Sequence, residues 1–311
     1  MRALFIVGPT ACGKSALAAN CAWRIGGEII SCDSMQIYRY MDIGTAKSTE
    51  QECGVPVHMV DIVEPNSEFS AFEYAEHSIA IAESLYGEGK LPIFAGGTGL
   101  YAHATIFPLT FGAAKDENVR AELERELEKK GAQAMWEELA SLDPDDAAKI
   151  HPNNTKRLLR ALEIARVSGV TKPKGESLKP RFAVKMIFLK PPRDALYAAI
   201  DDRVERMFDS GLEEEVRSLV GERQLDFGMQ SMQAIGYREF APYLSGEISL
   251  QQLKEQIKKD TRRYAKRQET WFSRYKFAIE VDPFSTPIDE LAALALSKDG
   301  YFYGEDNAEN R

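Results

Sequence analysis

The sequence predicts an α/β fold with a three-layer core, in which a mainly parallel sheet lies between helices. Short unbroken apolar runs are the first indication, because strands buried on both faces of a parallel sheet have this pattern. These runs alternate with helical segments, as they do in α/β proteins. A charged helical stretch then interrupts the alternation, which predicts an inserted all-helical subdomain, and further helices fill the C-terminal region.

The composition is that of an ordinary globular protein with an acidic balance. The 311 residues are 44% hydrophobic and carry 39 Lys and Arg against 48 Asp and Glu, a formal charge of −9. This balance excludes a globally basic nucleic-acid binder but not a local basic face. No apolar run approaches the roughly 20 residues of a membrane helix, and 1–7 is too short for the apolar part of a signal peptide. We therefore expect a soluble, cytoplasmic protein with no membrane partner, and nothing in the sequence suggests more than a monomer.

The N-terminal part of the chain carries the alternation. Strands are expected at 3–7, 28–31, 57–61 and 91–95. Helices are expected at 16–25 and 71–86. A Gly-containing turn at 8–15 joins the first strand to the first helix, and Gly-Gly-Thr-Gly follows the last of these strands.

The remainder is mostly helical. From 116 to about 148 the pattern favours a solvated pair of charged helices, with Glu122, Glu126 and Lys130 at i, i+4 spacing. We take 113–145 as the inserted subdomain, which could move as a lid, and 1–112 with 146–311 as the core. A late core strand is expected at 183–189. The expected helices are 154–167, 193–210, 212–221 and 250–277.

The four cysteines all lie in the first 53 residues, at Cys12, Cys21, Cys32 and Cys53. Their separations match neither a zinc-ligand pattern nor a CxxC motif. We therefore interpret them as reduced structural thiols.

The turn at 8–15 matches the GxxxxGK[ST] pattern of a phosphate-binding loop (P-loop). Its residues are Gly8, Pro9, Thr10, Ala11, Cys12, Gly13, Lys14 and Ser15. An expected strand precedes it and an expected helix follows, which is the context this motif requires. Backbone N–H groups and a helix N-terminus attract phosphate oxygens, Lys14 adds a positive charge, and Ser15 offers a hydroxyl ligand for Mg²⁺. The sequence thus predicts a di- or triphosphate site without naming its ligand.

A carboxylate follows the second strand. Asp33 lies near the carboxyl edge of the expected sheet, where ligands bind in open α/β folds. It could accept a proton from an attacking nucleophile, or it could simply cap a turn. Asp61, at the end of the expected strand 57–61, is a weaker candidate for organising Mg²⁺, and a turn-capping role is favoured there.

An arginine interrupts an apolar helix face. At about 100° per residue, Leu196, Ile200 and Val204 form one stripe, and Arg203 falls in its middle. An unpaired buried guanidinium is costly. Arg203 must therefore reach solvent, pair with a carboxylate, or meet an anionic ligand.

The last long helix is locally basic. Residues 258–276 contain eight Lys and Arg against two acidic residues. An apolar and aromatic seam (Leu253, Ile257, Tyr264, Trp271 and Tyr275, with Gln268) lies on the same helix. Such segregated charge in an acidic chain favours phosphate contact over a merely solvated face. Lys156, Arg157 and Arg160 form a smaller basic ridge.

Seven motifs in order carry a resemblance to a known family. They are GPTACGKS at 8–15, DSMQIY at 33–38, MDIGTAK at 41–47, GGTGLY at 96–101, HPNNTKRLLRALE at 151–163, SMQAIGYRE at 231–239 and TRRYAKRQETWF at 261–272. From residue 1 to about 284 the chain resembles the tRNA dimethylallyltransferases, the bacterial tRNA isopentenyltransferases.

The resemblance implies transfer of the dimethylallyl group from dimethylallyl diphosphate to N6 of the adenine 3′ of the anticodon. The P-loop would then hold the prenyl diphosphate with Mg²⁺ on Ser15, and the target adenine would be flipped into a pocket. Asp33 would be the general base, and Arg203 would face the departing diphosphate. The channel where adenine meets the prenyl chain would be lined by Gly96, Gly97 and Thr98.

The resemblance also implies contacts with the tRNA anticodon stem-loop, and an insertion that faces the tRNA. The candidate contact residues are Asp33, Ser34, Met35, Gln36, Thr98, Arg120, Lys156, Arg157, Leu158, Leu159, Arg160, Gln233, Ala234, Ile235, Gly236, Tyr237, Arg238, Arg262, Arg263, Lys266 and Arg267.

Three other functions stay open. An adenylate isopentenyltransferase would use the same chemistry on a free nucleotide, but it needs neither the basic helix nor the charged insertion. A small-molecule P-loop kinase would bind ATP at Lys14 and use Asp33 to activate a hydroxyl. A non-catalytic RNA-binding P-loop module leaves Asp33 and Arg203 without a role.

Overall fold

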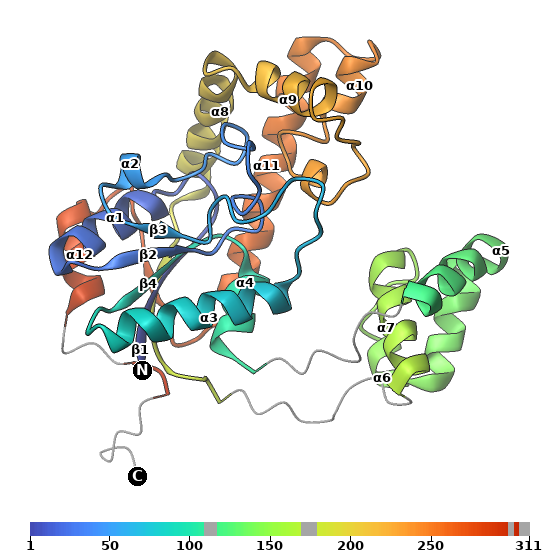
Figure 1. Cartoon of the computed structure of the whole chain (residues 1–311), viewed down its shortest axis with the longest axis horizontal. Helices are drawn as coiled ribbons and strands as arrows, with labels where there is room; N and C mark the ends of the chain where they lie inside the picture. Colours follow the sequence, from blue (N-terminus) through green and yellow to red (C-terminus); the bar gives the residue numbers. More distant parts are fainter. Residues whose placement is uncertain (109–116, 169–178, 298–301, 305–311) are drawn as a thin grey trace. The chain divides into compact units, whose positions relative to one another are not determined.

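The computed structural model describes residues 1–108, 117–168, 179–297 and 302–304. The chain forms two compact units, each with its own core (Figure 1). The first unit comprises Met1–Phe107 and Lys179–Arg311, and the second comprises Pro108–Leu178.

A parallel sheet is the centre of the first unit. Within the described residues it has six strands in the order β3-β2-β4-β1-β5-β6. They are β1 (Arg2–Val7), β2 (Glu28–Ser31), β3 (Val57–His58), β4 (Pro92–Gly96), β5 (Ala183–Leu189) and β6 (Ile279–Val281). Val7 lies opposite Gly96 and Phe188, so the carboxyl ends of the central strands meet at one edge. The predicted α/β class is confirmed.

Alternate side chains of β1 explain the two helix layers. Phe5 packs into one apolar cluster with residues of α3 (Ala71–Gly87) and α4 (Gly99–Ile106). Leu4 and Ile6 pack into another with residues of α1 (Lys14–Ile25) and α12 (Ile288–Leu296). Figure 1 shows these helix pairs on opposite sides of the strands. Every residue from Ala3 to Val7 is fully buried, which is why the run is apolar without alternation.

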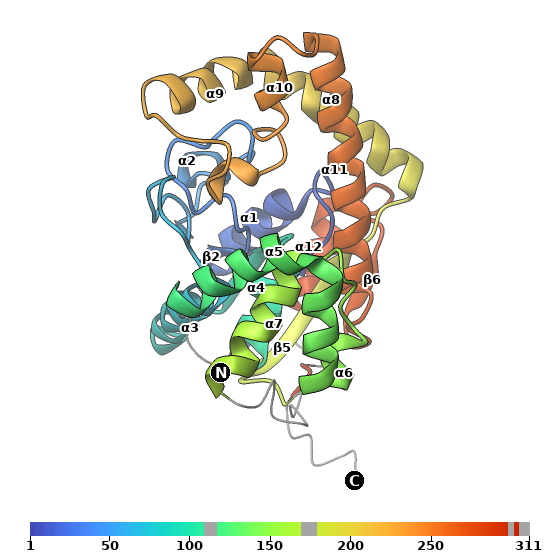
Figure 2. The ribbon, with the colours of Figure 1, turned by 90° about the vertical axis from the view of Figure 1, so that its right-hand side faces the viewer.

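The C-terminal helices extend beyond the sheet. They are α8 (Arg193–Asp209), α9 (Leu212–Gly221), α10 (Phe240–Leu244) and α11 (Leu250–Phe272), with a 3₁₀ turn at Ser231–Gln233. A capping box between Ser249 and Gln252 begins α11. Its inward seam buries Leu253, Ile257 and Gln268, as the spacing predicts, and Figure 2 shows the helix beside α8.

The second unit is a small helical cluster. It contains α5 (Glu117–Leu142), α6 (Pro144–Ala147) and α7 (Thr155–Ser168). Gly131 interrupts α5 with φ 78°, so the expected helix pair is present. Its core joins Leu123, Met135 and Leu139 to Leu158 and Leu162. The unit therefore extends past the expected boundary at 145, because α7 buries its leucine face against α5 and not against the sheet.

Several element boundaries differ from expectation. The strand expected at 57–61 stops at His58, because Met59 and Asp61 adopt positive φ angles of 61° and 54°. The helix expected to reach 277 ends at Phe272. Strand β6 and helices α2 (Glu50–Cys53), α4, α10 and α12 were not predicted. All four cysteines are free thiols, as expected. Among the described residues, none of the helices combines the length and apolarity needed to span a bilayer.

Candidate active site

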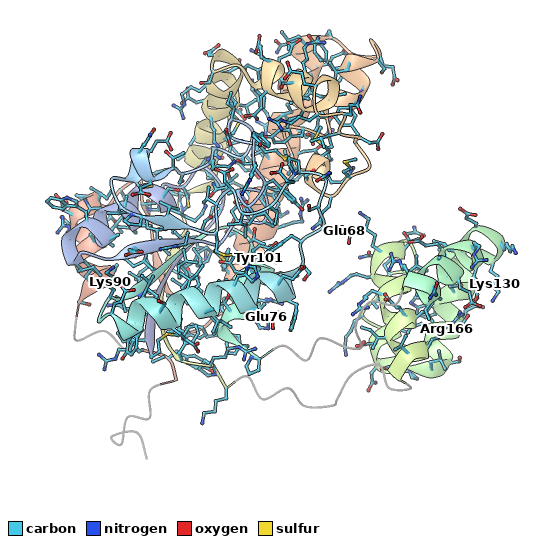
Figure 3. All side chains as sticks on the ribbon, in the orientation of Figure 1. Glu68, Glu76, Lys90, Tyr101, Lys130 and Arg166 are labelled. Carbon is cyan, nitrogen blue, oxygen red and sulfur yellow. The ribbon has the colours of Figure 1, made fainter. Side chains whose placement is uncertain are left out.

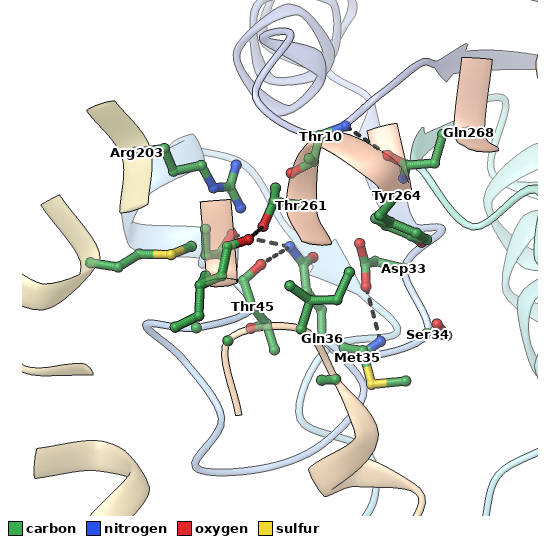
Figure 4. Close-up of a pocket in the computed structure, with 18 of the residues that line it drawn as sticks. Thr10, Asp33, Ser34, Met35, Gln36, Thr45, Arg203, Thr261, Tyr264 and Gln268 are labelled. Carbon is green, nitrogen blue, oxygen red and sulfur yellow. Dashed lines mark hydrogen bonds between the residues drawn. The ribbon is translucent and has the colours of Figure 1, made fainter. Parts of the chain in front are cut away.

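The candidate site lies at the carboxyl ends of β1, β2 and β4. The P-loop follows β1, Asp33 follows β2, and the Gly-Gly-Thr-Gly segment follows β4. A cavity of about 270 Å³ opens between them and the C-terminal helices (Figure 4). Lys14, Ser15, Asp33 and Arg203 all line it. The structure thus brings together the phosphate-binding and proton-accepting candidates, which lie up to 189 positions apart in the sequence.

The P-loop has the backbone that its motif requires. Gly13 has φ 86°, a conformation that favours glycine, and α1 begins directly after it at Lys14. The Lys14 ammonium donates a 2.6 Å hydrogen bond to the carbonyl of Pro9 within the same loop. The loop therefore places an ammonium group and a helix N-terminus at the cavity, a combination suited to phosphate oxygens.

Ser15 is the protein oxygen of the P-loop that could ligate Mg²⁺. It is exposed, its hydroxyl accepts a 2.7 Å hydrogen bond from the Ser48 hydroxyl, and it lines the cavity with Asp33. No cluster of three His, Cys, Asp or Glu suited to a metal occurs among the described residues. Mg²⁺ typically keeps waters and phosphate oxygens and takes only one or two protein ligands. This donor set therefore fits an ion that arrives with a diphosphate.

Asp61 is occupied elsewhere. Its carboxylate lies 2.6 Å from the Lys47 ammonium, which also donates to the Tyr38 carbonyl at 2.9 Å and pairs with Asp42. Lys47 is buried, so these contacts hold the 41–47 loop in place. Asp61 does not line the cavity. The contacts of Asp61 therefore support a structural role for this residue over a role in organising Mg²⁺.

Asp33 both caps a turn and faces the cavity. Its Oδ1 accepts a 2.9 Å hydrogen bond from the backbone N–H of Met35 (Figure 4). In the part of the chain that the structure describes, Oδ2 has no hydrogen-bond partner. Tyr264 also lines the cavity, and burial together with the nearby Asp33 charge raises the pKa of its phenol, which therefore stays protonated.

Thr98 supports the turn that carries Asp33. Its Oγ1 accepts from the backbone N–H of Ser34 at 2.9 Å and donates to the Ser34 hydroxyl at 3.3 Å. The cavity is lined by Ala95 and Gly96 and not by Thr98. Thr98 therefore orients the 33–34 turn from outside the cavity, because its hydroxyl is used in the hydrogen bonds with Ser34.

Arg203 enters the cavity from α8 across from Asp33 (Figure 4). Its neighbours Leu196, Ile200 and Val204 are buried, as the periodicity predicts. Desolvation lowers the pKa of the guanidinium, and the Asp33 charge partly opposes this effect. No ion pair of Arg203 occurs among the described residues. The alternative of a structural salt bridge is thus not what the fold provides, and an anionic ligand fits the position.

Gln268 joins two loops of the site. The buried side chain of this α11 residue accepts from the backbone N–H of Thr10 at 2.9 Å and donates to the Gly97 carbonyl at 2.9 Å. The P-loop and the Gly-Gly-Thr-Gly segment are therefore fixed relative to each other by one amide. The helical spacing placed Gln268 on the inward seam but gave no indication of these partners.

Two further loops, 41–47 and 233–238, form the cavity wall beside Asp33. Candidate tRNA-contact residues from the 33–36 turn, the 233–238 loop and α11 also line the cavity. They are Ser34, Met35, Gln36, Gln233, Ala234, Ile235, Gly236, Arg238 and Arg267. Tyr237 is fully buried instead. Sequence reasoning missed Gly44, Thr45, Ala46, Met207, Thr261 and Tyr264, although the 41–47 motif was a signal for the first three. Gln36 anchors that loop through its amide, which donates to the Ala46 carbonyl at 3.1 Å.

The basic helix is less free than its charge suggests. Nη1 of Arg262 donates to both carboxylate oxygens of Asp201, at 2.8 and 2.9 Å, and Arg263 pairs with Asp260 at 3.2 Å. Lys266 and Arg267 are exposed and have no ion pair within the described residues. The unpaired positive charge of α11 that could meet a polyanion therefore lies on these two residues and on the exposed Lys259.

The second unit has its own basic residues. Lys156 and Arg157 are exposed on α7, whereas Leu158 and Leu159 are buried in the helical core and offer almost no side-chain surface. Arg120 and Arg160 both form ion pairs with Glu163. Their Nη1 atoms lie 3.9 and 3.0 Å from its Oε2. The two leucines thus stabilise the unit, and of the candidate contact residues on α7 only the basic ones offer side-chain surface to solvent.

Comparison with known proteins identifies the family. A family model described as IPP transferase matches residues 36–275, and one described as isopentenyl transferase matches residues 1–55. The chain belongs to the IPP transferase family. The tRNA dimethylallyltransferase of Caldanaerobacter subterraneus subsp. tengcongensis is 46% identical, with 88% of this chain and 89% of that protein aligned. The one from Geobacillus thermodenitrificans is 43% identical, over 94% and 96%.

Solved structures of IPP transferase relatives have the same fold. The tRNA isopentenylpyrophosphate transferase of Bacillus halodurans aligns with a TM-score of 0.70 and 40% identity, over 94% of this chain and 95% of that one. A eukaryotic dimethylallyltransferase described as acting on tRNA aligns with a TM-score of 0.80 and 27% identity, over 94% and 77%. Membership of the tRNA dimethylallyltransferases, an enzyme family, and the P-loop type of core are therefore confirmed.

Proposed function

We propose that this IPP transferase moves the dimethylallyl group from dimethylallyl diphosphate to N6 of the adenine 3′ of the anticodon in tRNA, releasing diphosphate. The observation that carries the proposal is one cavity that joins the P-loop and Arg203 to the carboxylate of Asp33. A prenyl diphosphate requires the first group of residues, and an amine nucleophile requires the second.

The diphosphate end uses positive charge and backbone donors. The helix N-terminus, Lys14 and Arg203 face this part of the cavity. When the C1–O bond of the prenyl diphosphate breaks, its electron pair and the developing negative charge go to the diphosphate. Cationic groups fixed in a partly desolvated site stabilise that charge most in the transition state. Mg²⁺ held by Ser15 would supply further neutralisation of the phosphate oxygens.

The acceptor end uses one carboxylate. The lone pair of the adenine N6 forms the new bond to C1, and the N6 proton passes to Asp33. Oδ1 of Asp33 is held by Met35, which fixes the carboxylate while Oδ2 faces the reacting amine. Positioned general bases contribute about 10²–10⁴-fold in rate.

Access to that amine requires the adenine to leave its stack. Met35, Ile235 and the half-buried ring of Tyr264 provide apolar surface in the same cavity. Enzymes that modify a base in this way read the flipped base with polar groups and apolar contacts. The exposed Lys266 and Arg267 of α11, of which Arg267 lines the cavity, support binding of the RNA backbone.

A prenyl-transfer assay tests the proposal. Labelled dimethylallyl diphosphate and Mg²⁺ are incubated with the protein and either unmodified tRNA or AMP, and ATP turnover is measured in parallel. We expect label in tRNA and none in AMP. Label in AMP alone would indicate an adenylate isopentenyltransferase, and ATP turnover without prenyl transfer would indicate a kinase. RNA binding without either reaction would indicate a binding module.

A further inference from the structure

We propose that Glu215 on α9 is a positioning residue for the acceptor, because its single carboxylate holds together the two loops that form the cavity wall beside Asp33. These loops are 41–47 and 233–238, and we call them the acceptor wall. The inference rests on the proposed function and adds a residue that contacts neither the reacting atoms nor the cavity.

The Glu215 carboxylate accepts four hydrogen bonds. Oε2 accepts from the backbone N–H groups of Asp42 and Ile43, each at 2.8 Å. Oε1 accepts from the Gly44 N–H at 3.2 Å and from the Tyr237 hydroxyl at 2.7 Å. Three consecutive amides of one loop and a hydroxyl of the other are thus satisfied by one side chain from α9, which is 171–173 residues further along the chain than the 42–44 amides.

The two loops also touch directly at this point. A Cβ added to Gly44 would lie 2.5 Å from Cε2 of the Tyr237 ring, so the hydroxyl end of the ring packs closely against this glycine. Tyr237 is fully buried, and burial together with the Glu215 charge raises its phenol pKa well above 10. The hydroxyl therefore remains a donor to Glu215 at any working pH.

The hydrogen bonds of Glu215 mainly position the part of the cavity that would receive the acceptor base. Gly44 and Thr45 from one loop and Ala234 to Gly236 from the other line the cavity with Asp33. Within the described residues, no hydrogen-bond partner of Glu215 belongs to the P-loop, although Asp42 and Ile43 line a second cavity with Lys14 and Ser15. The end of the 41–47 loop that leads to the Ser48–Ser15 contact is anchored separately, by Gln36 on the Ala46 carbonyl and by buried Lys47 on the Tyr38 carbonyl.

Glu215→Gln is the sharpest test, because it preserves shape but changes the chemistry. A carboxylate only accepts hydrogen bonds, whereas an amide has one accepting oxygen and a donating NH₂ group. Whichever way it turns, the amide directs donors at backbone N–H groups that need an acceptor. Glu214→Gln is the matched control, since Glu214 is the exposed neighbour on the same helix. Tyr237→Phe removes only one donor and leaves the amides of the 41–47 loop satisfied.

The experiment measures kcat, the KM for unmodified tRNA, the KM for dimethylallyl diphosphate, and Tm for the three variants and the wild type. For E215Q we expect the KM for tRNA to rise about tenfold, while the KM for dimethylallyl diphosphate changes less than about twofold. We expect a smaller rise of about threefold in tRNA KM for Y237F, and wild-type constants for E214Q. A merely structural role would lower Tm without separating the two KM values.

Two results would overturn the inference while leaving the proposed function intact. One is an active wild type whose E215Q and Y237F variants match E214Q. The other is an equal rise of both KM values. If E215Q does not fold, Y237F decides by the same criterion. A wild type that transfers no prenyl group to any RNA would instead overturn the proposed function, and this inference with it.

Discussion

At the scale of single residues, one substitution separates the turn-capping contact of Asp33 from its proposed role as general base. Asn at this position keeps an oxygen to accept from the Met35 N–H but cannot take a proton at neutral pH. We therefore expect D33N to fold and bind tRNA as the wild type does, with a rate of prenyl transfer lowered about 10²–10⁴-fold. Single-turnover transfer and tRNA affinity, measured side by side, check this. Retained turnover would remove Asp33 as the general base.

Gln268 gives a second prediction at the residue scale. Met has a similar shape but makes neither of the two hydrogen bonds, so Q268M leaves the Thr10 N–H and the Gly97 carbonyl without their partner. A buried polar group left unsatisfied costs about 1–3 kcal/mol. We expect a lower Tm and a raised KM for dimethylallyl diphosphate, since the P-loop loses a support. Q251M on the exposed part of α11 is the control, and equal KM values for both variants would contradict the bracing role.

The P-loop, Asp33 and Arg203 could be found from the sequence, whereas Gln268 and Glu215 could not. Motif spacing and helical periodicity are local properties. They identify a residue only when its neighbours in the sequence indicate its role. Gln268 meets partners 258 and 171 residues away, and Glu215 meets amides more than 170 residues away. Such contacts exist only once the sheet has brought its carboxyl edge together with α9 and α11.

At the scale of elements, α11 carries the unpaired positive charge proposed to contact RNA on fewer residues than the sequence count suggests. Charge reversal at Arg262 would break its pair with Asp201 and disturb packing as well as binding. Lys266 and Arg267 offer the cleaner test. We expect K266E/R267E to weaken tRNA binding and to lower the slope of log affinity against log salt by about 1–2. The KM for dimethylallyl diphosphate serves as the internal control, and an unchanged salt slope would exclude this face.

The link between α5 and α7 predicts a pH dependence within the second unit. Hydrogen bonds from Arg166, at 2.8 and 3.0 Å, and from Lys130 lower the pKa of Glu126 from 4.5 to about 2 (Figure 3). Because the pKa is lower in the folded state, this stabilisation is complete above about pH 4.5 and is lost as the pH falls toward 2.

The matched variant for this pH dependence is E126Q. At pH 7 we expect it to be less stable than the wild type by about 1 kcal/mol, the size typical of a partly exposed ion-pair network. The difference in unfolding free energy should shrink as the pH is lowered from 4.5. Hydrogen exchange of α5 and α7 amides in the two proteins measures it locally, and a difference that is constant with pH would contradict the ion-pair origin.

The same local limits explain which elements could be predicted. β1, β2, β4 and β5 have apolar centres, interrupted only by Lys185 in β5, and the pattern locates them within one residue at each end. β3 is shortened by the left-handed backbone at Met59 and Asp61. Asp adopts this conformation more often than most residues, but Met gives no indication of it. α7 was recognised as a helix, but its amphipathic pattern could not say which partner would cover the leucine face. That partner is α5.

At the scale of the whole molecule, each unit has its own hydrophobic core, whereas the P-loop, Asp33 and the acceptor wall all belong to the first unit. A ligand that binds only the folded first unit stabilises it by RT ln(1 + [L]/Kd). Inorganic pyrophosphate with Mg²⁺ is the simplest probe of the diphosphate end of the site.

We therefore expect pyrophosphate with Mg²⁺, at about 100 times its Kd, to add about 2.7 kcal/mol to the unfolding free energy of the first unit. Hydrogen exchange should slow around 8–15 and in α1 but not in α5 or α7, because the second unit contributes no P-loop residue. K14A should lose most of this effect, since it removes the ammonium that lines the cavity. Equal protection of both units, or an unchanged response in K14A, would show that pyrophosphate binds elsewhere than at the P-loop.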